Sequence, residues 1–190
     1  MAHVRYATRG SKDKILEEAH PHVIGGQVEN RDNHILIWDC DMAAVHNGQV
    51  DQVFFRDSAP EHMYSSCDTE ALLYLYRDHG EYSFLKEVPG AYTIAIADKR
   101  NKDVIVMRDR TGIKPGVLGW KDGKYGVASE DIAFRKNGGE YIEDLEPGAI
   151  YYLTPEGNYS KELLVETNLA HCFFEWNYIT DLDSIVNGVS

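Results

Sequence analysis

His46, Asn47 and Gly48 follow a short apolar run at residues 43–45, and they form the first candidate site of the chain. An Asn-Gly pair after a strand is typical of a tight turn, because both residues tolerate positive φ. The pair also supplies a side-chain amide and a backbone N–H that approaches a ligand closely. Two such donors aimed at one point would form an oxyanion hole. These residues alone leave both interpretations open, with the simple turn favoured.

Three other polar features have structural explanations as well as functional ones. Arg5 follows a strand-like segment, and an arginine there is usually a surface ion-pair partner. Asp68 precedes the most regular helical pattern, where the helix dipole and unpaired N–H groups favour a carboxylate, as in an ordinary cap. Residues 108–115 carry several charges between two strands and can be a simple connector. Taken singly, each of these features favours the structural explanation, and only their combination in one chain favours a functional site.

Composition excludes several classes of function. The 190 residues carry 31 acidic and 19 basic side chains, a formal charge of −12, which disfavours binding to nucleic-acid phosphates. Cys40, Cys67 and Cys172 show no metal-type spacing, and their odd number suits a reducing compartment. We therefore expect no metal, no cofactor and a cytoplasmic location. Neither a signal peptide nor a membrane-spanning run is evident in the sequence.

The hydrophobic pattern predicts a single α+β domain over residues 1–190. We expect two mainly antiparallel sheets packed face to face with helices outside. The predicted helices are 69–79, ended by Gly80, then 82–88 and 130–135, the last capped by Ser129. A short helical turn is expected at 12–20 and a loop at 24–33. The predicted strands are 3–8, 34–38, 43–48, 91–97 paired with 103–107, 117–120 paired with 125–128, and 141–145 paired with 149–153.

Six segments together resemble the class II glutamine amidotransferases, which are N-terminal-nucleophile hydrolases that take ammonia from glutamine. In order they are HVRYATRG, HNGQV, SSCDTEALL, PGAYTIAIAD, RDRTGIKPGVLG and ASEDIAF. The resemblance covers nearly the whole chain and is greatest to the glutaminase domain of amidophosphoribosyltransferases, enzymes of purine biosynthesis. It implies the αββα fold of that class. The chain departs from the pattern near its C-terminus, where Asp181-Leu182 replaces the usual Arg-Pro.

The resemblance assigns a substrate clamp to four residues. Arg5 would pair with the α-carboxylate of glutamine, because its planar guanidinium can donate two parallel N–H bonds to a carboxylate. Asp68 would hold the α-ammonium group, and Tyr6 and Thr8 would line the pocket near Arg5. Such a clamp would select the free amino acid rather than a peptide.

The resemblance also assigns the oxyanion hole. Asn47 and the N–H of Gly48 would stabilise the oxyanion that forms at the side-chain amide, at roughly 3–4 kcal/mol per donor. His46 would pack and position this stretch. Residues 108–115 would be a structural crossing without a catalytic role.

The family's nucleophile has no counterpart in these 190 residues. It is a mature N-terminal cysteine whose own α-amine is the base, whereas removal of Met1 here would expose Ala2. An internal cysteine has no free α-amine, and Cys67 stands beside the carboxylate of Asp68, which disfavours a thiolate. We expect an N-terminally incomplete domain that releases no ammonia by itself.

Several partners and alternatives follow from the resemblance. A synthase domain or subunit would accept the ammonia, and an N-terminal complementing segment or a second copy would complete an exposed strand edge. The alternatives are an amidotransferase subunit of glutamate synthase type and a catalytically dead glutamine-binding or assembly module.

Overall fold

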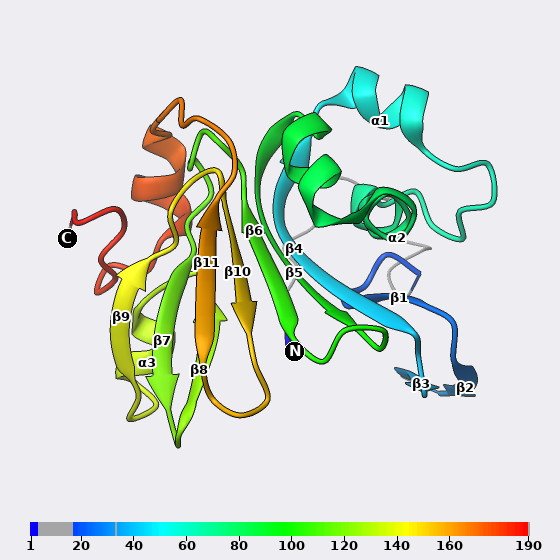
Figure 1. Cartoon of the computed structure of the whole chain (residues 1–190), viewed down its shortest axis with the longest axis horizontal. Coiled ribbons are helices and arrows are strands. Elements are labelled where there is room, and N and C mark those ends of the chain that lie inside the picture. The colour runs from blue at the N-terminus through cyan, green and yellow to red at the C-terminus, as the bar shows by residue number, and fades with distance from the viewer. Residues whose placement is uncertain (4–16, 33, 190) are drawn as a thin grey trace.

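The computed structural model describes residues 1–3, 17–32 and 34–189, and its core is a six-stranded antiparallel sheet with the strand order β1-β4-β5-β6-β10-β11 (Figure 1). A three-stranded sheet, β8-β7-β9, packs on one face, and helix α2 covers the other. The six strands are β1 (His22–Ile24), β4 (Met42–Val50), β5 (Gly90–Asp98), β6 (Val104–Arg108), β10 (Ala149–Leu153) and β11 (Tyr159–Leu163). The three are β7 (Val117–Lys121), β8 (Lys124–Ala128) and β9 (Glu140–Asp144). The predicted α+β fold of two stacked sheets is confirmed.

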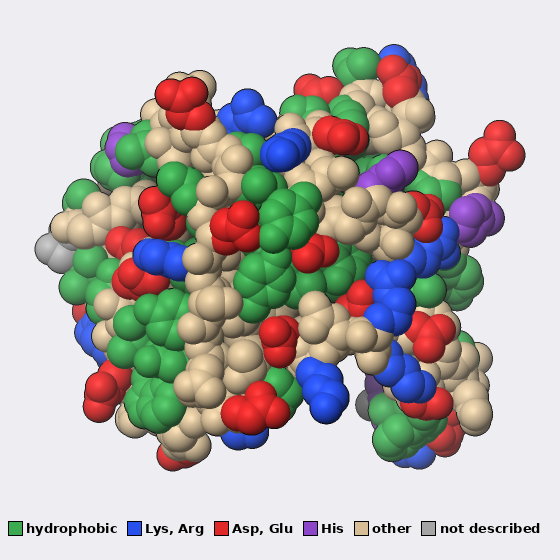
Figure 2. Space-filling model, viewed as in Figure 1, with side chains coloured by type: hydrophobic (Ala, Val, Ile, Leu, Met, Phe, Trp, Pro, Cys, Tyr) green, Lys and Arg blue, Asp and Glu red, His purple; other side chains and the backbone are tan. Residues whose placement is uncertain are grey.

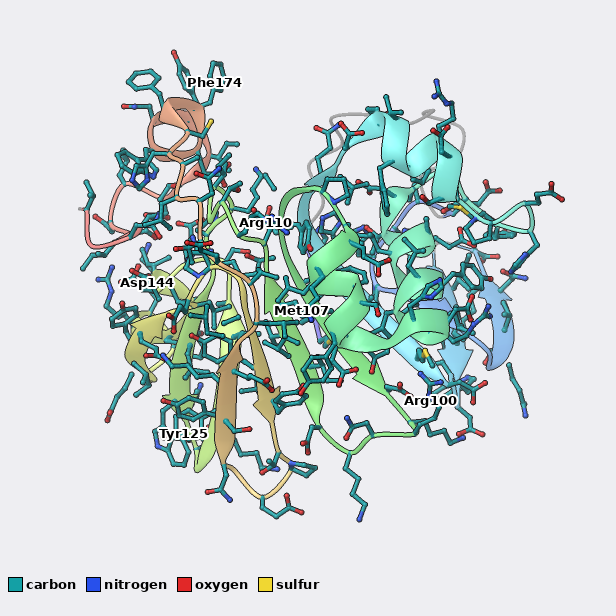
Figure 3. All side chains as sticks on the ribbon, turned by 45° about the horizontal axis from the view of Figure 1, so that its top comes forward. Arg100, Met107, Arg110, Tyr125, Asp144 and Phe174 are labelled. Carbon is teal, nitrogen blue, oxygen red and sulfur yellow. The ribbon has the colours of Figure 1, made fainter. Side chains whose placement is uncertain are left out.

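Helix α2 (Asp68–Glu87) buries its apolar side chains against β4, β5 and β6. Leu72, Leu73 and Tyr76 contribute from the helix, and Figure 3 shows Met107 of β6 beneath it. The helix bends at Gly80, whose φ of 75° interrupts the helical backbone. Two helical halves on either side of this glycine match the prediction, since glycine at positive φ is the usual helix end. The short helix α1 (Gln52–Ser58) is capped by Asp51.

A second core fills the space between the sheets. Val106 and Tyr151 point into it from the six-stranded sheet, and Leu118 points into it from β7. Helix α3 (Ile132–Arg135) packs on β7 and β9. The layers are therefore helix, sheet, sheet and helix, which is the αββα order.

The predicted pairing of 141–145 with 149–153 is wrong. Strand β9 pairs with β7, whereas β10 pairs with β6 and β11. The chain changes sheets at residues 145–148: the N–H of Leu145 bonds to the carbonyl of Gly116, and the N–H of Gly148 bonds to the carbonyls of Arg108 and Asp109. The two strands are neighbours in sequence but belong to different sheets.

The predicted loop at 24–33 contains a strand, β2 (Gln27–Arg31), which pairs with β3 (His34–Trp38) in a separate two-stranded sheet. This hairpin projects at the lower right of Figures 1 and 2. Residues 34–38 form the predicted strand; the short apolar run also suggested that this strand is buried, which is wrong, because none of its five residues is buried and Trp38 is 57% exposed. Figure 2 shows basic and acidic side chains interspersed on this face of the protein.

The C-terminal segment contains a π-helical turn, Glu175–Ile179, whose Glu175 carboxylate bonds to Lys114 Nζ at 2.6 Å. Phe173, Phe174 and Tyr178 are exposed, and Figure 3 shows Phe174 pointing away from the body of the protein. The predicted strand 3–8 and helical turn 12–20 fall mostly outside the described residues. Among the described helices, none combines the length and apolar character needed to cross a membrane.

Candidate functional site

Asn47 and Gly48 lie within strand β4, not in a turn, so the turn prediction is wrong. Asn47 is opposite Thr93 of β5, and Gly48 is opposite Tyr92. Gly48 has a φ of 147°, and a Cβ added there would lie 2.2 Å from the carbonyl oxygen of Ala91. The positive φ therefore serves a close approach of two strands rather than a reversal of the chain.

The N–H of Gly48 faces the edge of β4 that lies away from β5. Opposite residues of an antiparallel pair either exchange both backbone hydrogen bonds or exchange none. Tyr92 uses both of its backbone groups elsewhere: its N–H donates to the Asp109 carboxylate, and its carbonyl accepts from the Asp109 N–H. Gly48 and Tyr92 therefore form a non-hydrogen-bonded pair. Ala44 lies opposite His22, the first residue of β1, and beyond it this edge of β4 has no strand partner among the described residues.

Asp68 lies at the same edge of β4, at the start of α2, where the sequence placed it. Its Oδ2 accepts a hydrogen bond from the N–H of Val50 at 3.3 Å. Val50 is two residues after Gly48, so the N–H groups of both point the same way. The Asp68 side chain is 20% exposed, and no lysine or arginine of the described residues forms an ion pair with it. A partly buried carboxylate without a cation is suited to bind an ammonium group.

The side-chain amide of Asn47 contacts Ser129, the residue that follows β8 of the three-stranded sheet. Its Nδ2 donates to Ser129 Oγ at 3.3 Å, across 82 residues of sequence. An amide carries two N–H donors, so this bond leaves one available for a ligand. The expectation that Ser129 caps a helix is wrong, because α3 begins at Ile132 and its N-cap residue is Asp131.

His46 is buried under the start of α2, with 4% of its surface exposed. Its Nδ1 lies 3.0 Å from Thr69 Oγ1 and 3.8 Å from Asp68 Oδ1. Burial lowers the pKa of His46 from 6.5 to about 4, because desolvation of the imidazolium outweighs the attraction of Asp68. The imidazole is therefore neutral at pH 7 and forms no ion pair with Asp68. His46 belongs to β4 and contacts Thr69 of α2, so it is suited to hold the two elements together.

The lowered pKa of His46 predicts a loss of stability in acid. In the unfolded chain His46 has a pKa near 6.5, so between pH 6.5 and pH 4 it is protonated there but mostly neutral in the folded protein. The free energy of unfolding therefore falls as the pH drops from 6.5 toward 4. Between pH 7 and pH 4.5 the free energy of unfolding should fall by about 2–3 kcal/mol more in the native protein than in His46→Gln. Urea unfolding at both pH values measures this, with His62→Gln, at an exposed position, as the control. Equal pH dependence in native protein and His46→Gln would contradict it.

The segment after β6 is anchored by Arg108, which is 1% exposed. Its guanidinium donates to the carbonyls of Lys114, Gly112 and Leu145. The Lys114 carbonyl also accepts from Thr93 Oγ1, and Thr93 is the β5 partner of Asn47. Arg108 thus fixes a loop beside the candidate site through backbone contacts.

Sequence reasoning missed the residues that shape the entry to α2. The buried carboxylate of Glu70 accepts from the N–H groups of Tyr64 and Ser65, both at 2.7 Å, and so fixes the loop before the helix. A Ser-Ser-x-x-x-Glu spacing ahead of an apolar run resembles a capping signal and could have indicated this contact. Arg5, Tyr6 and Thr8 lie outside the described residues.

A cavity of about 340 Å³ lies elsewhere, between the two sheets. Val45, Val104 and Leu153 line one wall and Tyr125 and Val127 the other. Neither Asn47, Gly48 nor Asp68 contributes to its lining. The candidate site is therefore the open edge of β4 and not this cavity.

One group of side chains in the described residues has the composition of a metal site. Ligand atoms of His20, His22 and Cys67 lie within 4.8 Å of one another. The group adjoins Asp68, because Cys67 Sγ lies 3.7 Å from Asp68 Oδ1.

Comparison with known proteins supports the resemblance to glutamine amidotransferases. Residues 41–162 match the family model described as a glutamine amidotransferase domain. The amidophosphoribosyltransferase of Pasteurella multocida is 31% identical over all of this chain and 40% of its own length. That of Methanothermobacter thermautotrophicus is 29% identical over 99% of this chain and 39% of its own. The chain thus spans about two-fifths of these curated relatives.

Solved structures give the same result. The glutamine phosphoribosylpyrophosphate amidotransferase of Bacillus subtilis, complexed with ADP and GMP, superposes with a TM-score of 0.75 and 27% identity, over 99% of this chain and 40% of its own. A structure described as the allosteric regulatory enzyme of purine biosynthesis has a TM-score of 0.75 and 28% identity, over 98% and 39%. The chain therefore belongs to the class II glutamine amidotransferase domains, of the type found in amidophosphoribosyltransferases.

Proposed function

We propose that the edge of β4 binds free glutamine and stabilises the oxyanion formed at its side-chain amide. The main support is the Asp68 carboxylate, which accepts from Val50 N at the edge that the Gly48 N–H also faces. Asp68 would take the α-ammonium group, and the Gly48 N–H and Asn47 Nδ2 would take the developing oxyanion. Arg5 would bind the α-carboxylate, with Tyr6 and Thr8 beside it.

Calorimetry with two ligands tests the role of Asp68. Glutaramate, which is glutamine without its α-amino group, keeps the amide and the α-carboxylate position. Asp68→Asn keeps an oxygen for the Val50 N–H and loses the charge, so it should weaken glutamine binding at least about tenfold. Its affinity for glutaramate should stay within about twofold of that of the native protein.

Asp78→Asn is the matched control, because Asp78 lies on the same helix and pairs with its neighbour Arg77 on the surface. This variant should bind glutamine as the native protein does. Equal weakening of both ligands by Asp68→Asn would contradict the ammonium contact. Unchanged glutamine affinity in Arg5→Ala would remove Arg5 from the proposed clamp.

We also propose that the 190-residue polypeptide binds glutamine without hydrolysing it. Hydrolysis of this type needs a cysteine with a free α-amine, and Cys40, Cys67 and Cys172 are internal. Ammonia release that is blocked by alkylation of Cys67 would overturn this proposal. A polypeptide that binds no glutamine at all would support an assembly role instead.

The partner proposed for the domain is a synthase that accepts ammonia. The relatives are amidophosphoribosyltransferases and are longer than this chain, so a phosphoribosyl acceptor in purine biosynthesis is the proposed destination. A glutamate synthase acceptor is the alternative. Assembly with a complementing segment or a second copy also stays a proposal, which sedimentation of the purified polypeptide tests.

A further inference from the structure

We propose that His20, His22 and Cys67 form a binding site for Zn²⁺ or a similar borderline-soft divalent transition metal. This site adjoins the proposed glutamine contact Asp68, whose Oδ1 lies 3.7 Å from Cys67 Sγ, but it does not depend on glutamine binding. Two imidazoles and a thiolate are the donor types that such ions prefer over Mg²⁺ or Ca²⁺, which select oxygen ligands.

The distances between the ligand atoms fit a tetrahedral ion. Usual Zn–N and Zn–S bond lengths place neighbouring N and S ligands about 3.5 Å apart. His20 Nε2 and Cys67 Sγ are 3.7 Å apart, which matches this edge. All three ligand atoms lie within 4.8 Å of one another, so the longest separation would have to close by at most about 1.3 Å to reach this spacing.

The surroundings are also those of a built site. His22 and Cys67 are buried, at 7% exposure each, and His20 is half-buried, which leaves a path for the ion. Thr69 Oγ1 lies 3.1 Å from His20 Nε2 and 3.5 Å from Cys67 Sγ, and it also contacts His46 Nδ1 at 3.0 Å. Metal binding would replace the Thr69 contact at His20 Nε2, because a coordinated ring nitrogen keeps neither a hydrogen nor a lone pair for the hydroxyl.

The three residues come from two elements that the ion would join. His22 begins β1, and His20 precedes it by two residues; their rings pack edge to face with centroids 5.1 Å apart. Cys67 is the N-cap residue of α2. Three protein ligands leave a fourth position for water. A bound ion would tie β1 to the start of α2, immediately before Asp68.

Metal titration of the purified polypeptide tests the site, with Zn²⁺ and Co²⁺ as the probes. Zn²⁺ should bind at one equivalent per chain and raise the thermal unfolding midpoint. Co²⁺ should give a thiolate-to-cobalt charge-transfer band together with the visible bands of a tetrahedral ion. Cys67→Ser should abolish the charge-transfer band, and Cys67→Ser and His22→Gln should each lower Zn²⁺ affinity at least 100-fold.

Cys172→Ser and His34→Gln are the matched controls, and both should bind Zn²⁺ as the native protein does. Circular dichroism of each variant checks that the fold is retained. If Cys67→Ser fails to fold, protection from alkylation replaces it: Zn²⁺ should protect Cys67 while Cys40 and Cys172 react as before. Equal Zn²⁺ affinity in folded Cys67→Ser, cobalt bands without charge transfer, or an unprotected Cys67 would overturn the proposal.

Discussion

Replacing Gly48 with alanine is expected to lower the free energy of unfolding by about 4 kcal/mol. The φ of 147° is a conformation that alanine rarely adopts, and the new Cβ would lie 2.2 Å from the carbonyl oxygen of Ala91. Backbone atoms of β5 cannot rotate away as a side chain can, so β4 and β5 must separate. Chemical denaturation measures the loss.

Gly123→Ala separates strain from crowding. Gly123 has a φ of 80°, but an added Cβ there would meet nothing within 4 Å. This variant should lose only about 1–2 kcal/mol, the cost of the positive φ alone. Equal losses in the two variants would show that the approach of β4 to β5 does not require glycine.

Arg108→Met is expected to cost about 3–5 kcal/mol, because the buried carbonyls of Lys114, Gly112 and Leu145 would lose their donor. The thermal unfolding midpoint should fall by about 10 °C. Burial already lowers the pKa of Arg108, since desolvation penalises its charge. The hydrogen bonds to the carbonyls compensate that penalty, so the residue works as a cross-link between segments.

Two further variants test this role. Arg108→Lys should recover less than half of the loss, because one ammonium cannot reach acceptors arranged around a planar fork. Arg56→Met removes an exposed arginine that pairs only with Asp57 among the described residues, and it should cost at most about 0.5 kcal/mol. Full rescue by lysine would indicate that charge, and not the fork geometry, matters at position 108.

Local signals predicted the elements that local interactions determine. Gly80 ended the first half of α2 as expected, and Asp68 began it. The hairpins β5–β6 and β7–β8 followed from polar turns between apolar runs. The predicted pairing of β9 with β10 was wrong because two sheets compete for each strand, and adjacency in sequence does not decide between them.

The candidate site shows the same division. Asn47-Gly48 was recognised as a special pair, but its Gly φ permits a close strand approach as well as a turn, and only the position of β5 distinguishes them. The bond from Asn47 to Ser129 joins residues 82 apart, so no local pattern indicates it. The grouping of His20 and His22 with Cys67 likewise depends on tertiary contact between β1 and α2.

A crystal structure of the polypeptide soaked with glutamine would show directly whether the edge of β4 binds this substrate. We expect the α-ammonium group against the Asp68 carboxylate, with the side-chain amide oxygen within hydrogen-bond distance of Gly48 N and Asn47 Nδ2. Glutamine bound elsewhere, for example in the cavity between the sheets, would contradict it. So would glutamine at Asp68 whose amide oxygen is out of reach of both donors.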